Sequence, residues 1–142
     1  DLINLDLKSK TKNDVIKELM KSLKDSEKVT SSEKALSALF AREELGTTGI
    51  GKGVAIPHAK TDAVSDLLVG FGISKEGINY GSMDDEAVKI FFIFLSPLDG
   101  NQEYLKILAR ISRLIREDKF RTDLLQAETA EEIMEIINKE ES

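Results

Sequence analysis

The stretch VKIFFIFLS, residues 88–96, is a run of apolar residues rich in β-branched and aromatic side chains, and Pro97 closes it. A short, bounded apolar run of this kind is typical of a strand that is buried on both faces of a sheet. A second run with the same character, LLVGFGIS, occupies residues 67–74. The two runs predict the centre of a β-sheet.

Helical patterns lie on both sides of these strands in the sequence. Residues 12–24 place apolar side chains at a spacing of three to four residues, which predicts an amphipathic helix. A second helix is expected to begin after Ser31 or Ser32, either of which can cap it, and to end near Leu45, where Gly46 is a suitable stop. The order of helices around strands predicts an α/β layered domain.

The sequence after Pro97 predicts three further helices. The first covers residues 101–117, and shorter helical segments follow at 120–125 and 129–138. One face of the first of these helices is expected to be buried. It consists of Leu105, Leu108, Ile111, Leu114 and Ile115.

Length and hydropathy fit one domain that spans residues 1–142. The chain has 142 residues and is 41% hydrophobic, which is enough apolar material for a core of ordinary size. No stretch approaches the roughly 20 uninterrupted apolar residues that span a bilayer, and the N-terminal residues lack the layout of a secretory signal. We therefore expect no membrane insertion. The sequence begins with Asp1 rather than Met, which leaves a larger parent polypeptide open.

Charge and cysteine content narrow the classes of function. With 26 acidic and 20 basic residues the net charge is −6, so the basic excess that nucleic-acid binding normally requires is absent. The chain has no cysteine, which excludes disulfides, thiolate catalysis and cysteine-based zinc sites. We expect a cytoplasmic protein with no nucleic-acid partner.

The segment GTTGIGKG, residues 46–53, almost matches the phosphate-binding loop of nucleotide hydrolases. The loop places Gly53 where that motif needs the Ser or Thr that holds magnesium. A helix precedes it and the apolar run VAIP follows it, which reverses the usual order of strand and helix. Nucleotide binding is therefore not expected, and the glycines indicate a loop with positive φ angles that leads into a short strand.

His58 is the only histidine, and it follows Pro57 in the run VAIPHA. A single histidine is commonly a surface residue or a hydrogen-bonded structural one. Here small residues flank it, Pro57 stiffens its approach and the glycine-rich loop lies just upstream, which together favour an exposed ring beside backbone N–H donors. A neutral imidazole is a nucleophile near pH 7, so we expect His58 to carry a phosphoryl group. One histidine without cysteine cannot form a zinc site, and we expect no metal or other cofactor.

Residues 42–58, REELGTTGIGKGVAIPH, resemble the active-site signature of the mannitol/fructose-type enzyme IIA of the bacterial phosphoenolpyruvate:sugar phosphotransferase system. The order of strands and helices over nearly the whole chain is also similar to that family. The resemblance implies an α/β fold in which a mixed β-sheet is flanked by helices on both faces. It also implies phosphorylation of His58 at Nε2 by the histidine phosphocarrier protein and delivery of the phosphoryl group to a cysteine of enzyme IIB.

The resemblance also suggests which residues support His58. Arg42 aligns with the arginine of the family motif, and its forked guanidinium is suited to two phosphoryl oxygens, although it is equally an ordinary charge at a helix end. Gly49, Gly51 and Gly53 are expected to support the loop. Because the chain has no cysteine and no second histidine, onward transfer must be intermolecular.

One position departs from the family. Many members have a second histidine at the start of the helix after the Ser-Pro loop, and this sequence has Tyr104 there, in the context YLKIL. A tyrosine hydroxyl can donate a hydrogen bond to a phosphoryl oxygen but carries no positive charge. Tyr104 is either an aromatic residue on the helix surface, the interpretation we favour from sequence, or a secondary residue of the site.

Two outputs are compatible with this chemistry. The first is sugar uptake, in which the chain passes phosphate from the histidine phosphocarrier protein to enzyme IIB. The second is a regulatory protein of the nitrogen-related branch, in which phosphorylation of His58 switches contacts with a protein target. A structural domain without catalytic chemistry is the third interpretation, and it predicts that His58 is never labelled.

Overall fold

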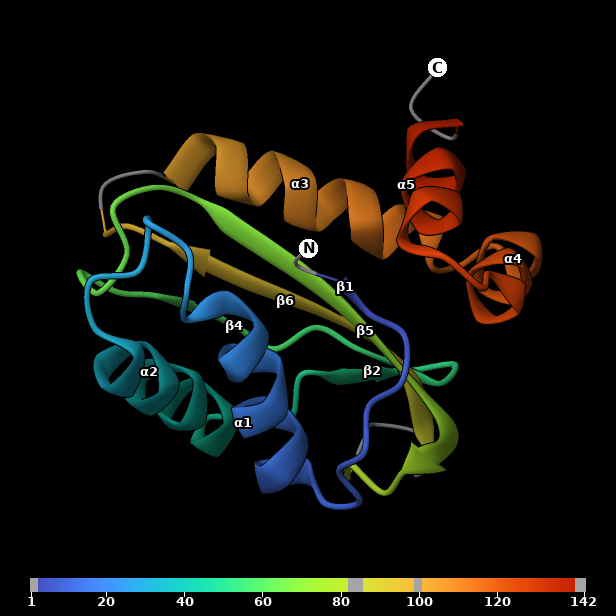
Figure 1. The fold of residues 1–142 in the computed structure, drawn as a ribbon, viewed down its shortest axis with the longest axis horizontal. Coiled ribbons are helices and arrows are strands. Elements are labelled where there is room, and N and C mark those ends of the chain that lie inside the picture. The colour runs from blue at the N-terminus through green and yellow to red at the C-terminus, as the bar shows by residue number, and fades with distance from the viewer. Residues whose placement is uncertain (1–2, 82–85, 99–100, 140–142) are drawn as a thin grey trace.

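The computed structural model describes residues 3–81, 86–98 and 101–139. Within them the chain forms a sheet with helices before and after its two long strands (Figure 1). The elements run in the order β1 (Ile3–Asn4), α1 (Lys12–Leu23), α2 (Ser32–Glu44), β2 (Gly49–Gly51), β3 (Val54–Ala55), β4 (His58–Lys60), β5 (Leu68–Ile78), β6 (Val88–Ser96), α3 (Asn101–Leu114), α4 (Asp118–Gln126) and α5 (Ala130–Lys139).

The antiparallel pair β5 and β6 forms the centre of the sheet, as the two apolar runs predict. Phe71 of β5 lies opposite Phe92 of β6, and their rings meet edge to face with centroids 4.9 Å apart. Strand β1 adds to β5 in parallel, β3 and β4 both add to β6 in parallel, and β2 pairs antiparallel with β3. The sheet is therefore mixed, with the order β1-β5-β6-β3-β2 and β4 beside β6.

Helices cover both faces of the sheet, which confirms the predicted architecture. Helices α1 and α2 lie on one side of β5 and β6, and α3, α4 and α5 lie on the other (Figure 1). The side chains of β6 alternate between two hydrophobic clusters because successive residues of a strand point to opposite faces. Phe91, Ile93 and Leu95 belong to the α1–α2 cluster, and Ile90, Phe92 and Phe94 belong to the α3–α5 cluster.

The first two helices follow the sequence pattern closely. Thr11 caps α1 by accepting a hydrogen bond from the backbone N–H of Asp14, and Ser31 caps α2 in the same way. Strand β5 differs from the prediction, because it continues four residues past Ser74. Its register against β6 shifts between Ile73 and Ile78, and Gly77 there has a φ of 84°. An irregularity of this kind interrupts the apolar pattern from which the strand was predicted.

The buried face of α3 agrees with the predicted one except at its first residue. Leu105, expected in the core, is 56% exposed, whereas Tyr104 is only 4% exposed. The stripe that faces the sheet starts at Tyr104 and includes Ile107 and the four other predicted residues, Leu108, Ile111, Leu114 and Ile115. Residue 105 lies about 100° further around the helix than residue 104, so only one of the two can face the sheet.

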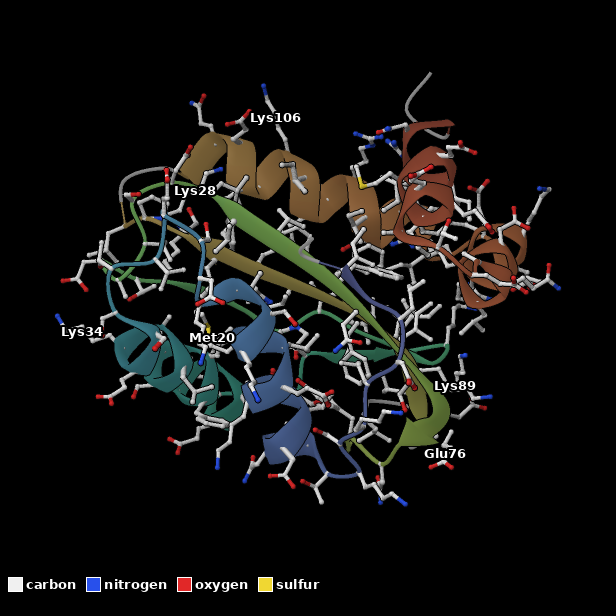
Figure 2. The ribbon with its side chains drawn as sticks, in the orientation of Figure 1. Met20, Lys28, Lys34, Glu76, Lys89 and Lys106 are labelled. Carbon is white, nitrogen blue, oxygen red and sulfur yellow. The ribbon has the colours of Figure 1, made fainter. Side chains whose placement is uncertain are left out.

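Charged side chains surround this core. Figure 2 shows the charged ends of Lys34 on α2 and Lys106 on α3 pointing outward from the ribbon. Among the described residues, no helix combines the length and the apolar character needed to cross a membrane.

Candidate functional site

His58 lies at the start of β4, where three elements meet around an open pocket of about 590 Å³. Strand β4 pairs with β6, with His58 opposite Phe94. The last turn of α2 brings Arg42 to the pocket, and the first turn of α3 brings Tyr104. The structure therefore places three of the residues singled out in the sequence in one pocket, although α2 and α3 lie on opposite faces of the sheet.

The imidazole of His58 has one of its nitrogens engaged. Nδ1 lies 2.7 Å from the carbonyl oxygen of Ile56. Because a carbonyl oxygen only accepts hydrogen bonds, Nδ1 carries the proton of the neutral ring and Nε2 keeps its lone pair. Among the described residues, none forms a hydrogen bond with Nε2. The ring is half-buried and lines the pocket, so Nε2 is the ring nitrogen whose lone pair is available there.

The surroundings of His58 hold its pKa below the ordinary value. Burial of the ring is the largest cause, and the positive charge of Arg42 acts in the same direction. The hydrogen bond to Ile56 and the negative charge of Glu43 act against this lowering. The net effect is a neutral imidazole at pH 7, which is the form that can attack an electrophile.

Arg42 is attached to the loop that follows its own helix. Its Nη1 donates a hydrogen bond to the carbonyl oxygen of Gly46 at 2.8 Å. This contact restrains the guanidinium at the end of α2, and its charge influences the pKa of both His58 and Tyr104. A guanidinium has five N–H donors, so this bond leaves donors with which it can bind an anion.

Tyr104 is not a surface aromatic residue, contrary to the interpretation favoured from the sequence. Its ring centroid lies 6.2 Å from that of His58, and the two rings are inclined by 51°. Burial raises the pKa of its hydroxyl, so the group remains a hydrogen-bond donor at neutral pH. The tertiary fold thus places Tyr104 beside the histidine.

Lys60 is a residue of the pocket that the sequence reasoning missed. Its ammonium lies 5.7 Å from the centroid of the Tyr104 ring, within the range of a cation–π contact. The signal in the sequence is the spacing, because residues i and i+2 of a strand lie on the same face, and Lys60 follows His58 by two positions in β4.

The three loop glycines lie outside this pocket. Gly51 and Gly53 have φ angles of 97° and 78° and flank Lys52, which has a φ of 58°, so they form the tight turn between β2 and β3. Gly49 lies within β2 opposite Ala55 and has no positive φ. None of the three lines the pocket of His58. The glycines therefore shape the hairpin that precedes the histidine, and only two of them require the conformational freedom of glycine.

Metal ligands are not grouped in the part of the chain that the structure describes. Within residues 3–81, 86–98 and 101–139, no group of three or more His, Asp or Glu side chains could hold a metal ion. The polar side chains that line the pocket are those of His58, Arg42, Lys60, Tyr104 and Glu44, so its two cations outnumber its one carboxylate. An excess of positive charge beside a neutral imidazole suits an anionic group.

The fold and the pocket define a class of α/β protein with a histidine at a strand end beside two cationic side chains, and comparison with known sequences assigns the chain to a family. Residues 1–140 match the family described as phosphoenolpyruvate-dependent sugar phosphotransferase system, EIIA 2. The fructose-specific EIIA component of Haloferax volcanii is 39% identical over 137 residues, which cover 96% of this chain and 89% of that protein. The chain belongs to the EIIA 2 family, whose members take part in phosphotransfer.

Solved structures support the same assignment. The nitrogen regulatory protein IIA-Ntr of Neisseria meningitidis superimposes with a TM-score of 0.89 at 31% identity, over 96% of this chain and 94% of that one. Enzyme IIA for mannitol from Escherichia coli, in its complex with phosphorylated enzyme IIB, has the same fold, with a TM-score of 0.81 at 22% identity and coverage of 96% and 94%. The family thus contains both sugar-specific and nitrogen-regulatory members.

Proposed function

We propose that this chain carries a phosphoryl group on Nε2 of His58, accepts it from the histidine phosphocarrier protein, and passes it to a cysteine of an enzyme IIB during sugar uptake. The observation that carries the proposal is the 2.7 Å contact between Nδ1 of His58 and the carbonyl of Ile56, because it leaves Nε2 as the basic nitrogen in a pocket with two cations. Family membership and the mannitol enzyme IIA–IIB complex of Escherichia coli support the choice of partners.

Both transfers balance without an external proton donor. In the first, the lone pair of Nε2 attacks phosphorus while the bond between phosphorus and the donor imidazole breaks. His58 keeps its proton on Nδ1, so positive charge develops on the ring, and the carbonyl of Ile56 accepts a stronger hydrogen bond from it. In the second, a thiolate attacks phosphorus, the bond to Nε2 breaks, and His58 returns to the neutral Nδ1–H tautomer.

Stabilisation of the transferring group is assigned to the residues around the ring. Arg42 is proposed to pair with two phosphoryl oxygens, and the hydroxyl of Tyr104 to donate to a third. The expected catalysis is mainly positioning and charge stabilisation, as in other phosphoryl transfers. The two cations that line the pocket, Arg42 and Lys60, suit a phosphoryl dianion.

Exposed apolar residues beside the pocket suit a protein partner. Leu45 is 86% exposed and lines the pocket with His58, and Leu105 is 56% exposed next to Tyr104. Apolar side chains that remain exposed next to a functional site are typical of a docking surface. Because the proposed donor and acceptor are both components of a cytoplasmic relay, we place this protein in the cytoplasm.

The similarity to IIA-Ntr favours one second candidate, a regulatory protein whose target contacts change when His58 is phosphorylated. The chemistry at His58 is the same in both proposals, and only the output differs. Transfer of the phosphoryl group to a purified enzyme IIB cysteine supports the first. A labelled protein that no enzyme IIB discharges, but that binds a target in one phosphorylation state, supports the second.

The decisive experiment is labelling with phosphoenolpyruvate, enzyme I and the histidine phosphocarrier protein, followed by intact-mass measurement before and after acid treatment. We expect one acid-labile phosphoryl group on the wild-type chain and none on His58→Ala. The control is Lys34→Gln, a change on the outer face of α2 that should label like wild type. Absence of labelling on the folded wild-type protein, or equal labelling of His58→Ala, contradicts the proposal.

A further inference from the structure

Glu43, the neighbour of Arg42 in α2, has a buried carboxylate that the proposed transfer does not use. Its side chain is 6% exposed. Lys12 of α1 forms an ion pair with Oε1 at 2.9 Å, and the hydroxyl of Tyr80 donates to Oε2 at 3.1 Å. Thr48 donates twice, from its backbone N–H to Oε1 at 3.1 Å and from its hydroxyl to Oε2. We call these four residues, Lys12, Glu43, Thr48 and Tyr80, the Glu43 cluster.

The Glu43 cluster joins parts of the chain that are far apart in sequence. Lys12 begins α1, Glu43 is in the last turn of α2, Thr48 precedes β2 and Tyr80 follows β5. The ammonium of Lys12 also lies over the Tyr80 ring at 4.7 Å, and burial raises the pKa of the Tyr80 hydroxyl far above its usual range, so this group stays a donor. Every hydrogen-bonding site of the carboxylate thus has a fixed partner.

Stability alone is a weak reason for such a cluster. Replacing a buried ion pair by apolar residues of similar volume is often neutral or stabilising, because desolvation of the charges offsets their attraction. A fully paired buried carboxylate has a clearer consequence for geometry, since it can hold its donors in only one arrangement. The donor that matters here is the backbone N–H of Thr48.

Three consecutive hydrogen bonds connect Glu43 to the ring of His58. The backbone N–H of Thr48 donates to the carboxylate, and the carbonyl of Thr48 accepts from the N–H of Ile56 at 2.9 Å. The carbonyl of Ile56 then accepts from Nδ1 of His58 at 2.7 Å. The carboxylate therefore restrains Thr48, Thr48 restrains Ile56, and Ile56 selects the tautomer of the histidine.

We propose that Glu43 is a positioning residue for phosphoryl transfer: through Thr48 and Ile56 it holds the carbonyl oxygen that keeps His58 in the Nδ1–H tautomer. The role of the tautomer in transfer rests on the proposed function above, but the link between Glu43 and the tautomer does not. Glu43 also anchors the turn of α2 that carries Arg42, so a single carboxylate positions both sides of the pocket.

The test compares two double variants that remove the same charges. Lys12→Met/Glu43→Met loses the acceptor for Thr48, whereas Lys12→Met/Glu43→Gln keeps an oxygen at that point. Both replace the ion pair by uncharged side chains of similar length, so neither leaves a buried charge without a partner. Glu43→Asp is the third variant, because it keeps the charge but withdraws the carboxylate by one methylene group.

The readouts are the tautomer of His58, measured by ¹⁵N NMR of the ring nitrogens, and the rate of phosphorylation by the phosphorylated histidine phosphocarrier protein at saturating concentration. We expect Lys12→Met/Glu43→Gln, abbreviated Met/Gln, to keep the wild-type tautomer and about the wild-type rate, within roughly twofold. Lys12→Met/Glu43→Met, abbreviated Met/Met, should give a mixture of tautomers. Its rate should be lower by roughly 10- to 100-fold, as when groups that orient a histidine are removed. Glu43→Asp should change both readouts in the same direction as Met/Met.

The proposal is overturned if folded Met/Met keeps the wild-type tautomer and rate. It is also overturned if Met/Met and Met/Gln lose the tautomer preference and the rate equally, since the lost charges rather than the lost acceptor would then be responsible. If Met/Met does not fold, wild-type values in folded Glu43→Asp overturn it. The NMR measurement needs no phosphoryl donor. A wild-type protein that is never labelled therefore contradicts the proposed function, while the tautomer comparison still decides the role of Glu43.

Discussion

Nδ1 of His58 donates a hydrogen bond to the carbonyl oxygen of Ile56, only two residues before it in the chain, at 2.7 Å. This local contact determines which nitrogen of the ring is basic, and Pro57 between the two residues restricts the backbone that makes it. The same ring borders a pocket with Arg42, Lys60 and Tyr104. The predictions below separate the contribution of each of these groups.

The pH dependence of phosphorylation should reflect the lowered pKa of His58. Burial and Arg42 keep the ring neutral, so we expect a rate that is constant from pH 8 to pH 7 and falls only below the unperturbed value of about 6.5. Because the unfolded chain binds this proton at a higher pH than the folded one, the free energy of unfolding should decrease as the pH falls below about 6.5. His58→Gln should lack this component of the stability profile, and a rate that falls between pH 8 and pH 7 would contradict the expectation.

Replacement of Arg42 should affect transfer more than stability. Arg42→Gln removes the guanidinium, and we expect the rate of phosphorylation to fall by roughly 10²- to 10³-fold, as for other groups that stabilise charge in a transition state. Arg42→Lys should recover only part of the rate, because an ammonium cannot bind two oxygens in a fork. The lost bond to Gly46 should lower the free energy of unfolding by about 1 kcal/mol. Equal rates for wild type and Arg42→Gln in a quenched-flow assay would exclude the assigned role.

The hydroxyl of Tyr104 should contribute a hydrogen bond to the phosphoryl group. Tyr104→Phe keeps the buried ring and removes only the donor, so we expect the rate to fall by about 3- to 10-fold while the melting temperature changes little. Tyr104→His supplies an imidazole at the position where many relatives have one, and it should transfer faster than Tyr104→Phe. A Tyr104→Phe protein with wild-type kinetics would assign the tyrosine to packing alone.

Lys60 should assist through its charge, and its effect should depend on salt. Lys60→Gln removes an exposed ammonium beside the pocket, and we expect a rate lower by about fivefold at low ionic strength, which corresponds to about 1 kcal/mol for charges near 4 Å apart in water. The difference from wild type should shrink as salt is added. Lys106→Gln is the matched control, because Lys106 lies on α3 and points away from the protein in Figure 2. Equal effects of the two substitutions would show that only the net charge matters.

Gly72 should be required for packing rather than for transfer. A Cβ atom at this position would lie 2.8 Å from methyl carbons of both Leu7 and Leu19, which are themselves buried. We expect Gly72→Ala to lower the free energy of unfolding by about 1–3 kcal/mol, as overpacking usually does, and to leave the rate of the folded protein unchanged. Gly81→Ala is the comparison, because among the described residues beyond its chain neighbours none has an atom within 4 Å of its Cβ, and the expected cost comes from a φ of 72°. Chemical denaturation of the two variants measures the difference.

The secondary structure was largely predictable from the sequence, and the reasons are local. Strand β6 coincides with the predicted residues because its apolar run is long and ends at Pro97. Helix α2 has the expected cap at Ser31, since capping depends on residues within one turn. The two-residue strand β1 and the end of β5 escaped prediction because a pairing so short or irregular leaves no periodic pattern to detect.

The buried face of α3 was predicted correctly except at Leu105, because apolarity alone ranked Leu105 above Tyr104. A tyrosine can lie in the core when its hydroxyl reaches a polar pocket, and the pocket of His58 is formed by elements that the sequence does not place next to α3. Lys60 and Glu43 were missed for a similar reason: lysine and glutamate are common on surfaces, and the sequence does not show which elements pack beside them.

What the sequence determined by itself is the single candidate for the nucleophile and the order of elements around it. A single histidine without any cysteine leaves one candidate for a phosphoryl carrier, and periodic apolar runs specify strands and helices through interactions between near neighbours. Only the tertiary structure decided the tautomer of His58, the approach of Arg42, Lys60 and Tyr104, and the burial of Glu43. These depend on packing between α2, β4 and α3, and distances across such contacts are set by the whole core rather than by any local pattern.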